Sequence, residues 1–166
     1  MAKNIVWTTV FILIAGLLES ALLEKLTLYD AKPDLALGIL VYSAYVNGTM
    51  SGQLTGFISG IFIDFLSQAP LGLNALVRTI IGALGGLIRD RFFLGRVLLP
   101  MTLCAAATAL KALMVFILHL LFAGAVPAYS LAGPTFWSEL LLNTASAPFL
   151  FGLLRLFNPL LTRRKR

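Results

Sequence analysis

Ionisable and amide side chains are scarce in this sequence, and those that interrupt its apolar segments are the first candidates for chemistry. A charge at the centre of a membrane span costs about 2.5–3.5 kcal/mol on insertion scales, so each one needs a partner or a function. One set falls in the half of the predicted segments away from the chain termini: Glu19, Asp64, Asn74, Arg78, His119 and Asn143. This outer polar cluster is either an internal network that fixes the order of the helices or a pocket that opens to the outside.

The members of the outer polar cluster differ in what their positions predict. Asp64 and Arg78 lie on either side of a short turn, and we expect them to form an ion pair across it. For Glu19 and Asn143 a structural role and a ligand-binding role remain equally open. Lys111 lies in the middle of a predicted span, and the sequence does not name a partner for it.

The sequence contains no recognisable catalytic or metal-binding motif. No nucleophile lies beside a base, no glycine-rich loop precedes a phosphate-binding lysine, and no His-Glu zinc motif occurs. His119 lacks the two or three further donors at helical spacing that a metal site requires. We therefore expect neither an enzyme nor a cofactor or metal, with lipid-modifying chemistry as the minority alternative.

The composition indicates that lipid, not water, covers most of the exterior of the chain. Of its 166 residues 59% are hydrophobic and 12% are charged, against roughly half and a quarter in a soluble domain. Thirteen basic and seven acidic residues cannot cover a soluble exterior. The net charge of +6 does not indicate nucleic acid, because the basic residues cluster directly after an apolar span. Cys104 is the single cysteine, which excludes an internal disulfide.

Charges and Gly or Pro pairs divide the apolar sequence into six predicted transmembrane helices within one membrane domain, residues 1–166. The fold class is therefore an all-α integral membrane protein. No cleavage site follows the first segment, so we expect it to remain as a helix. The spans cover residues 5–23, 33–46, 51–66, 73–88, 97–122 and 136–157.

The distribution of basic residues predicts the orientation of these helices. An even number of spans places both termini on one side, and that side carries most of the loop lysines and arginines, which marks it as the cytoplasm. Only Lys25 and Lys32 lie on the other side, and the turn at Asn47-Gly48 carries no charge of its own. The chain would thus be a multi-pass membrane protein with both termini in the cytoplasm. Its cytoplasmic anchor would be Arg163, Arg164, Lys165 and Arg166.

Small residues at helical spacing predict where helices approach closely. They form three stripes, along the third, fourth and fifth predicted spans. We expect at least one stripe to meet another protein, and Gly82 and Gly86 are the predicted contact. The stripes consist of Gly52, Gly56 and Gly60, of Gly82 and Gly86, and of Ala105 and Ala109.

With these spans placed, the chain from Pro33 almost to its end resembles the rod shape-determining protein MreD family. The resemblance rests on motifs that follow one another in order and spacing, with a basic tail after the last span. They are Pro33-Asp34, then Gly56, Gly60 and Asp64, then residues 70–76 (Pro-Leu-Gly-Leu-Asn-Ala-Leu), and in the last span Phe136-Trp137-Ser138, Asn143 and Pro148.

The resemblance implies a non-enzymatic scaffold subunit of the bacterial cell-wall elongation machinery, located in the bacterial cytoplasmic (inner) membrane. Such a subunit would bind MreC and work near MreB, RodA and a class B penicillin-binding transpeptidase. Its fold would be similar to the substrate-binding subunits of energy-coupling-factor importers. The alternative function is that of such an importer subunit, with the outer polar cluster as a vitamin pocket. The two differ in the pocket, because a ligand site needs roughly 300 Å³ or more.

Overall fold

Helices form the regular secondary structure of the computed structural model, which describes residues 2–22, 31–67, 69–89, 95, 97–122, 126 and 129–162. The all-α class is therefore confirmed. Each of the first six helices overlaps one of the six apolar segments, and α7 is an additional single turn. The helices are α1 Ala2–Leu22, α2 Leu35–Asn47, α3 Thr49–Leu66, α4 Leu73–Leu87, α5 Leu98–Leu121, α6 Pro134–Leu156 and α7 Asn158–Leu161.

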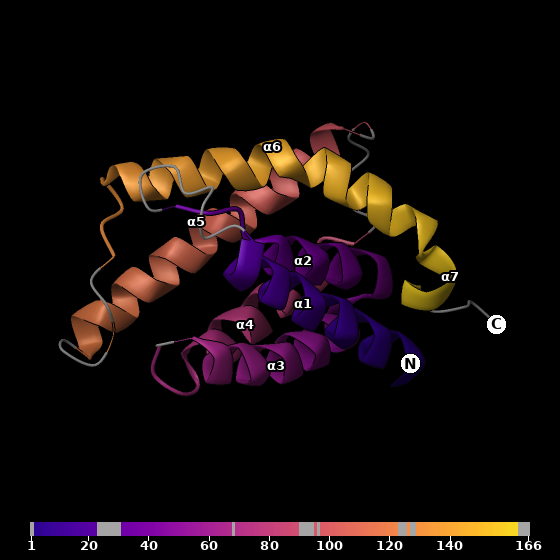
Figure 1. Ribbon diagram of the computed structural model, residues 1–166, viewed down its shortest axis with the longest axis horizontal. Coiled ribbons are helices and arrows are strands. Elements are labelled where there is room, and N and C mark those ends of the chain that lie inside the picture. Colours follow the sequence, from indigo (N-terminus) through magenta and orange to yellow (C-terminus); the bar gives the residue numbers. More distant parts are fainter. Residues whose placement is uncertain are drawn as a thin grey trace.

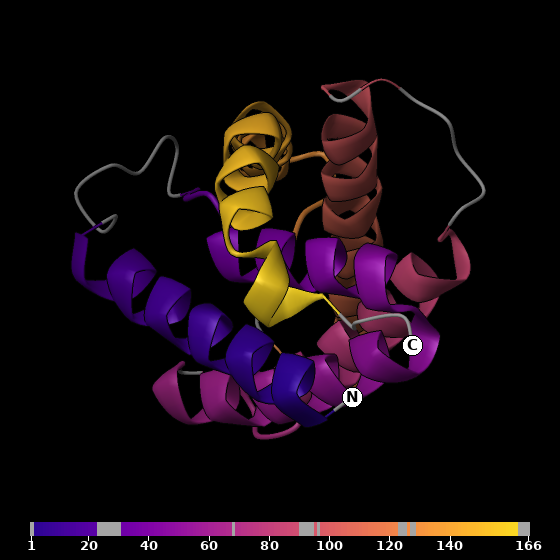
Figure 2. The same cartoon turned by 90° about the vertical axis from the view of Figure 1, so that its right-hand side faces the viewer.

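Helix α2 lies at the centre of the bundle. It contacts α1, α3, α4, α5 and α6, and an end-on view shows these helices around it (Figure 2). The α2 sequence is apolar on all sides, as expected for a helix enclosed by others, and its residues from Ala36 to Ala44 are all buried. The start of α1 and the short helix α7 lie at the same end of the molecule (Figure 1).

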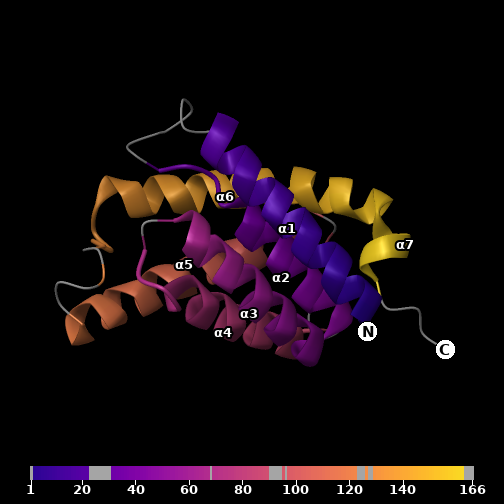
Figure 3. The same cartoon turned by 60° about the horizontal axis from the view of Figure 1, so that its bottom comes forward.

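Helices α3 and α4 run side by side and form the closest helix pair (Figures 1 and 3). Their backbones touch where the glycine stripes face each other. A Cβ atom on Gly52 would lie 2.2 Å from the carbonyl oxygen of Gly82, and one on Gly56 would lie 2.3 Å from that of Arg78. A Cβ on Gly86 would lie 2.3 Å from the backbone nitrogen of Thr49.

The expectation that Gly82 and Gly86 meet another protein is therefore wrong. Both glycines face α3 of the same chain, and their missing side chains allow the two helices of this hairpin to approach. The spacing of small residues predicted a close helix contact. The spacing alone does not show which helix packs against the small residues.

The turn between α2 and α3 obtains a positive charge from another part of the chain. Gly48 has a φ of 90°, a conformation that favours glycine. The Arg89 guanidinium, which follows α4, lies 3.4 Å from the place that a Cβ on Gly48 would occupy. The Asn47 side chain donates a hydrogen bond of 2.8 Å to the carbonyl of Leu161 in α7, which fixes the turn against the end of the chain.

The exterior of the described helices is rich in large apolar side chains. Phe149 of α6 is 82% exposed and Phe65 of α3 is 73% exposed. Two helices, over Ala2–Glu19 and Leu98–Leu121, are long and apolar enough to cross a membrane, and α2 and α4 are shorter apolar helices. An apolar exterior of this kind is suited to lipid rather than water.

The hairpin contact makes a first testable prediction. Replacing Gly82 with Leu should separate α3 from α4, because the new Cβ would meet the backbone of Gly52. Overpacking of this kind costs about 1–3 kcal/mol or more. Folded yield on size exclusion and the Tm in detergent should both fall. Gly152→Leu in α6 is the matched control, since a Cβ there has open space, and an equal loss in both variants would contradict the account.

Candidate functional site

The backbone N–H groups at the start of α2 donate hydrogen bonds to the α2 N-cap and to side chains of two other helices. Helix α2 has 13 residues and spans about 20 Å, less than the ~30 Å of a hydrocarbon core. The Asp34 carboxylate is its N-cap and accepts a 2.7 Å hydrogen bond from the Leu37 nitrogen. Glu19 of α1 accepts one of 2.8 Å from the Ala36 nitrogen. Asn143 of α6 accepts one of 2.6 Å from the Asp34 nitrogen.

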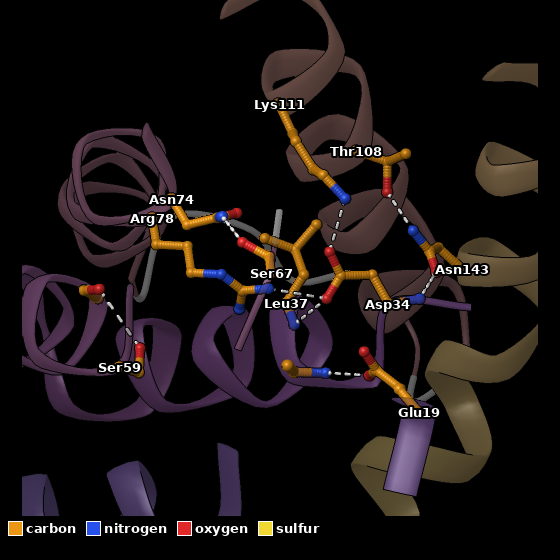
Figure 4. Close-up of polar contacts among 12 residues, drawn as sticks. Glu19, Asp34, Leu37, Ser59, Ser67, Asn74, Arg78, Thr108, Lys111 and Asn143 are labelled. Carbon is orange, nitrogen blue, oxygen red and sulfur yellow. Dashed lines mark hydrogen bonds and ion pairs between the residues drawn. The ribbon is translucent and has the colours of Figure 1, made fainter. Parts of the chain in front are cut away.

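The Asp34 carboxylate also holds two cations (Figure 4). Its Oδ1 atom lies 3.1 Å from Nη2 of Arg78 in α4, and its Oδ2 atom lies 2.7 Å from Nζ of Lys111 in α5. The side chains of Asp34 and Arg78 are 9% and 6% exposed, respectively. The cap of α2 is thus an ion-pair centre that joins three helices in a site largely removed from solvent.

Lys111 bridges Asp34 to a second carboxylate. Its Nζ atom lies 2.7 Å from Oε1 of Glu139 in α6, and the other Glu139 oxygen accepts a 2.7 Å hydrogen bond from the Tyr129 hydroxyl. Burial and this hydrogen bond raise the pKa of Tyr129 above its usual range. The four charged groups, Asp34, Glu139, Arg78 and Lys111, balance one another. We call these four residues the charge network.

The space beside Asp34, on the side of Thr108 and Asn143, is small. Asn143 donates a 2.9 Å hydrogen bond to the Thr108 hydroxyl, and that hydroxyl donates one of 2.9 Å to the Cys104 carbonyl. The space beside Asp34, Thr108 and Asn143 measures about 10 Å³, which is no larger than one water molecule requires. This side of the network therefore joins α2, α5 and α6 through direct contacts between side chains and backbone.

Asp64 forms a second carboxylate cap, at the start of α4. It accepts hydrogen bonds from the backbone nitrogens of Gly72, Asn74 and Ala75 at 2.9, 2.9 and 3.2 Å, and a further one from the Asn74 side chain at 3.0 Å. The predicted ion pair between Asp64 and Arg78 is therefore wrong. The unpaired donors at the start of α4 lie closer to Asp64, while Arg78 reaches across to α2.

The structure divides the outer polar cluster into separate groups. Glu19, Arg78 and Asn143 meet at the start of α2, and Asp64 and Asn74 form the α4 cap. His119 lies apart from both, with its Nδ1 atom 2.8 Å from the Val126 carbonyl. The described residues contain no group of three His, Cys, Asp or Glu side chains that could hold a metal ion. The predicted anchor at Arg163, Arg164, Lys165 and Arg166 lies outside the described residues.

The sequence analysis missed three members of this site as site residues: Asp34, Glu139 and Tyr129. Asp34 carries a recognisable signal, because an Asp immediately before an apolar helical run is a preferred N-cap. Glu139 lies near the start of the sixth predicted segment, where a carboxylate can be solvated, so its position gives no sign of burial. No local signal places Tyr129, which precedes α6, against Glu139.

The charge network predicts a specific pattern of stability. Lys111→Met leaves Glu139 without its cation, and breaking a buried pair in this way should cost about 3–5 kcal/mol. Adding Glu139→Gln removes the lone charge while Asp34 keeps Arg78, so the double variant should regain part of the loss. Thermal unfolding in detergent measures both. If the double variant is no more stable than Lys111→Met, the bridge through Lys111 is contradicted.

The charge swap between helices α3 and α4 is the matching negative control. Asp64→Arg and Arg78→Asp should each lower the Tm, and combining them should not recover it. Asp64 caps α4, whereas Arg78 pairs with Asp34, so the swap re-forms neither contact.

Comparison with known proteins identifies the family of the chain. No curated protein and no solved structure matches it significantly. The family model of the rod shape-determining protein MreD matches residues 1–157, almost the whole chain. This match agrees with the resemblance carried by Pro33-Asp34, the glycine stripe of α3 and residues 70–76. The chain therefore belongs to the MreD family of rod shape-determining membrane proteins.

Proposed function

We propose that this chain is a non-enzymatic scaffold of the bacterial cell-wall elongation machinery, which holds MreC and helps to organise peptidoglycan synthesis. MreB, RodA and a class B penicillin-binding transpeptidase would belong to the same complex. Membership of the MreD family supports the role in cell shape. The observation that favours a scaffold is that the four side chains of the charge network pair with one another.

Saturation of the Asp34 and Glu139 carboxylates argues against turnover at this site. Both oxygens of Asp34 and both oxygens of Glu139 already have donors. A catalytic acid or base must reach the proton that it transfers, and a carboxylate enclosed by a lysine and a tyrosine of its own chain does not. The energy of these contacts therefore supports the arrangement of the helices.

The importer alternative has weaker support. A vitamin-sized ligand needs a cavity of roughly 300 Å³ or more with convergent polar groups, and the space beside the charge network is about 10 Å³. A larger cleft of about 330 Å³ lies between α1 and α3, and none of the described residues that line it is aromatic. The described lining therefore lacks an aromatic wall against which a vitamin ring would stack.

The α5 surface is the best candidate for contact with MreC. The glycine stripes of α3 and α4 are used within the chain, whereas Ala109 of α5 is exposed and Ala105 is half-buried. Small residues on a lipid-facing helix allow a second helix to approach closely. A single-span partner could therefore pack along this face of α5.

The proposed placement has six membrane spans, lipid around them and both termini in the cytoplasm. The start of α1 and the helix α7 lie at one end of the molecule (Figure 1). Arg89 lies at the same end, beside Gly48, as a positively charged cytoplasmic side requires. The loops at Ala69 and Tyr129 would then face outward.

Cysteine labelling in intact cells tests this orientation. With Cys104 replaced by Ala, single cysteines at Ala69 and Tyr129 should react with a membrane-impermeant maleimide, because both lie in outer loops. Cysteines at Gly95 and Thr162 should react only after the membrane is permeabilised. Labelling of Thr162 in intact cells would contradict six spans with cytoplasmic termini.

Co-purification of MreC tests the partner surface. Ala109→Leu should reduce the amount of MreC recovered with the chain, because the larger side chain keeps a second helix away from α5. Its Tm should stay within about 1 °C of wild type, since the exposed position contributes little to stability. Gly152→Leu on α6 is the matched control. Recovery of MreC at the wild-type level with Ala109→Leu would exclude this face.

A further inference from the structure

Helix α1 is held against α2 and α3 near its start, and it diverges from α3 towards its other end, where Glu19 still contacts α2. Near its start the Asn4 side chain donates a 3.2 Å hydrogen bond to the Ser51 hydroxyl, and the hydroxyls of Thr8 and Ser43 lie 3.2 Å apart. Further along, a Cβ on Gly16 would have no neighbour within 4 Å. Figure 3 shows α1 and α3 diverging in this direction.

The divergence opens a cleft of about 330 Å³ whose polarity changes along its length. Leu13, Gly16 and Ile63 line its part nearer the middle of the helices. Glu19, Lys32 and Ser67 line its other end, together with Leu66 and Arg78. In the membrane placement proposed above, the apolar part faces the hydrocarbon and the polar part reaches the outer headgroup level. A phospholipid has the same change of polarity along its length.

Arg78 provides an unused donor in this cleft. Its Nη2 atom pairs with Asp34, but its Nη1 atom is buried and has no hydrogen-bond partner among the described residues. The residue is 5% exposed and lines the cleft. A charged donor removed from water without an acceptor is costly, so an acceptor supplied by a ligand would fit here.

Glu19 and Lys32 restrict the chemistry of that ligand. One Glu19 oxygen accepts the Ala36 hydrogen bond, and the carboxylate borders the same cleft as Arg78 and the exposed Lys32. A simple anion would accept from the arginine and the lysine but would meet the glutamate. A zwitterion carrying both a phosphate and an amine suits all three side chains.

We propose that this cleft binds an amine-bearing phospholipid such as phosphatidylethanolamine. Its phosphate accepts from Arg78 Nη1 and from Lys32, its ammonium group pairs with Glu19, and an acyl chain lies beside Leu13, Gly16 and Ile63. The lipid thereby fills the gap between α1 and α3. The proposal rests on the membrane placement but not on the binding of MreC.

Native mass spectrometry of the full chain tests the proposal. The wild-type protein is taken from vesicles with equal amounts of phosphatidylethanolamine, phosphatidylglycerol and phosphatidylcholine. We expect retention of phosphatidylethanolamine over the other two by about tenfold, the effect of one charged hydrogen bond. Equal retention of the three lipids would overturn the proposal. If soluble phosphoethanolamine displaces the bound phosphatidylethanolamine, the free headgroup is sufficient for binding and the proposal of a lipid ligand is overturned.

Two variants locate the lipid. Gly16→Leu fills open space in the cleft and should abolish retention while the Tm is kept, whereas the matched Gly152→Leu should retain the lipid. Glu19→Gln still accepts the Ala36 hydrogen bond but should lose the preference for phosphatidylethanolamine over phosphatidylglycerol. Unchanged retention with Gly16→Leu would overturn the proposal.

Recovery of MreC in the same samples separates this proposal from the scaffold function. Loss of the lipid with MreC still bound is the result we expect for Gly16→Leu. Loss of MreC with the lipid kept would show that the cleft contacts protein. That result would overturn the proposed lipid site but not the scaffold function.

Discussion

The start of α2 lies inside the protein, where its backbone N–H groups cannot be hydrated. A helix leaves its first four N–H groups without intrahelical partners, and Ala36 and Leu37 in the first turn of α2 are buried. Asp34, Glu19 and Asn143 accept hydrogen bonds from this first turn and from the residue before it. A buried carboxylate at this place then requires cations, which Arg78 and Lys111 provide, and Lys111 in turn pairs with Glu139. One unsatisfied helix end thus fixes five helices.

The α3–α4 hairpin depends on the same constraint through Arg78. Its two helices are held together by glycines that bring the backbones into contact, and α4 begins at a cap formed by Asp64 of α3. Because Arg78 extends from α4 to Asp34, the hairpin is fixed against α2 as a unit. Helices α2 and α4 therefore each begin at a buried carboxylate, Asp34 for α2 and Asp64 for α4.

Apolar runs predicted the helices well, because lipid exposure and burial both require apolar side chains along most of a span. The glycine stripe of α3 predicted a close contact for the same kind of local reason. Pairing across the bundle was harder to predict. The sequence favours an ion pair of Arg78 with Asp64, because the two lie close together in sequence. Helical periodicity shows on which face of a helix a residue lies, but not which helix packs against that face. Lys111 remained without a partner for this reason as well, since Asp34 and Glu139 lie far from it in sequence.

A rigid arrangement of charges suits a subunit that positions other proteins. The charge network lies in the interior of the described bundle and joins α2, α4, α5 and α6. The proposed contacts with MreC and with lipid, at Ala109 of α5 and in the cleft beside α1, lie outside this network apart from Arg78.

The most direct test is a cryo-EM structure of the chain with MreC in a lipid nanodisc, at a resolution that shows side chains. The account predicts that Lys111 Nζ lies within hydrogen-bond distance of both Asp34 and Glu139, and that the density between α2, α5 and α6 belongs to protein alone. Density for a bound small molecule between Asp34, Lys111 and Asn143 would contradict it.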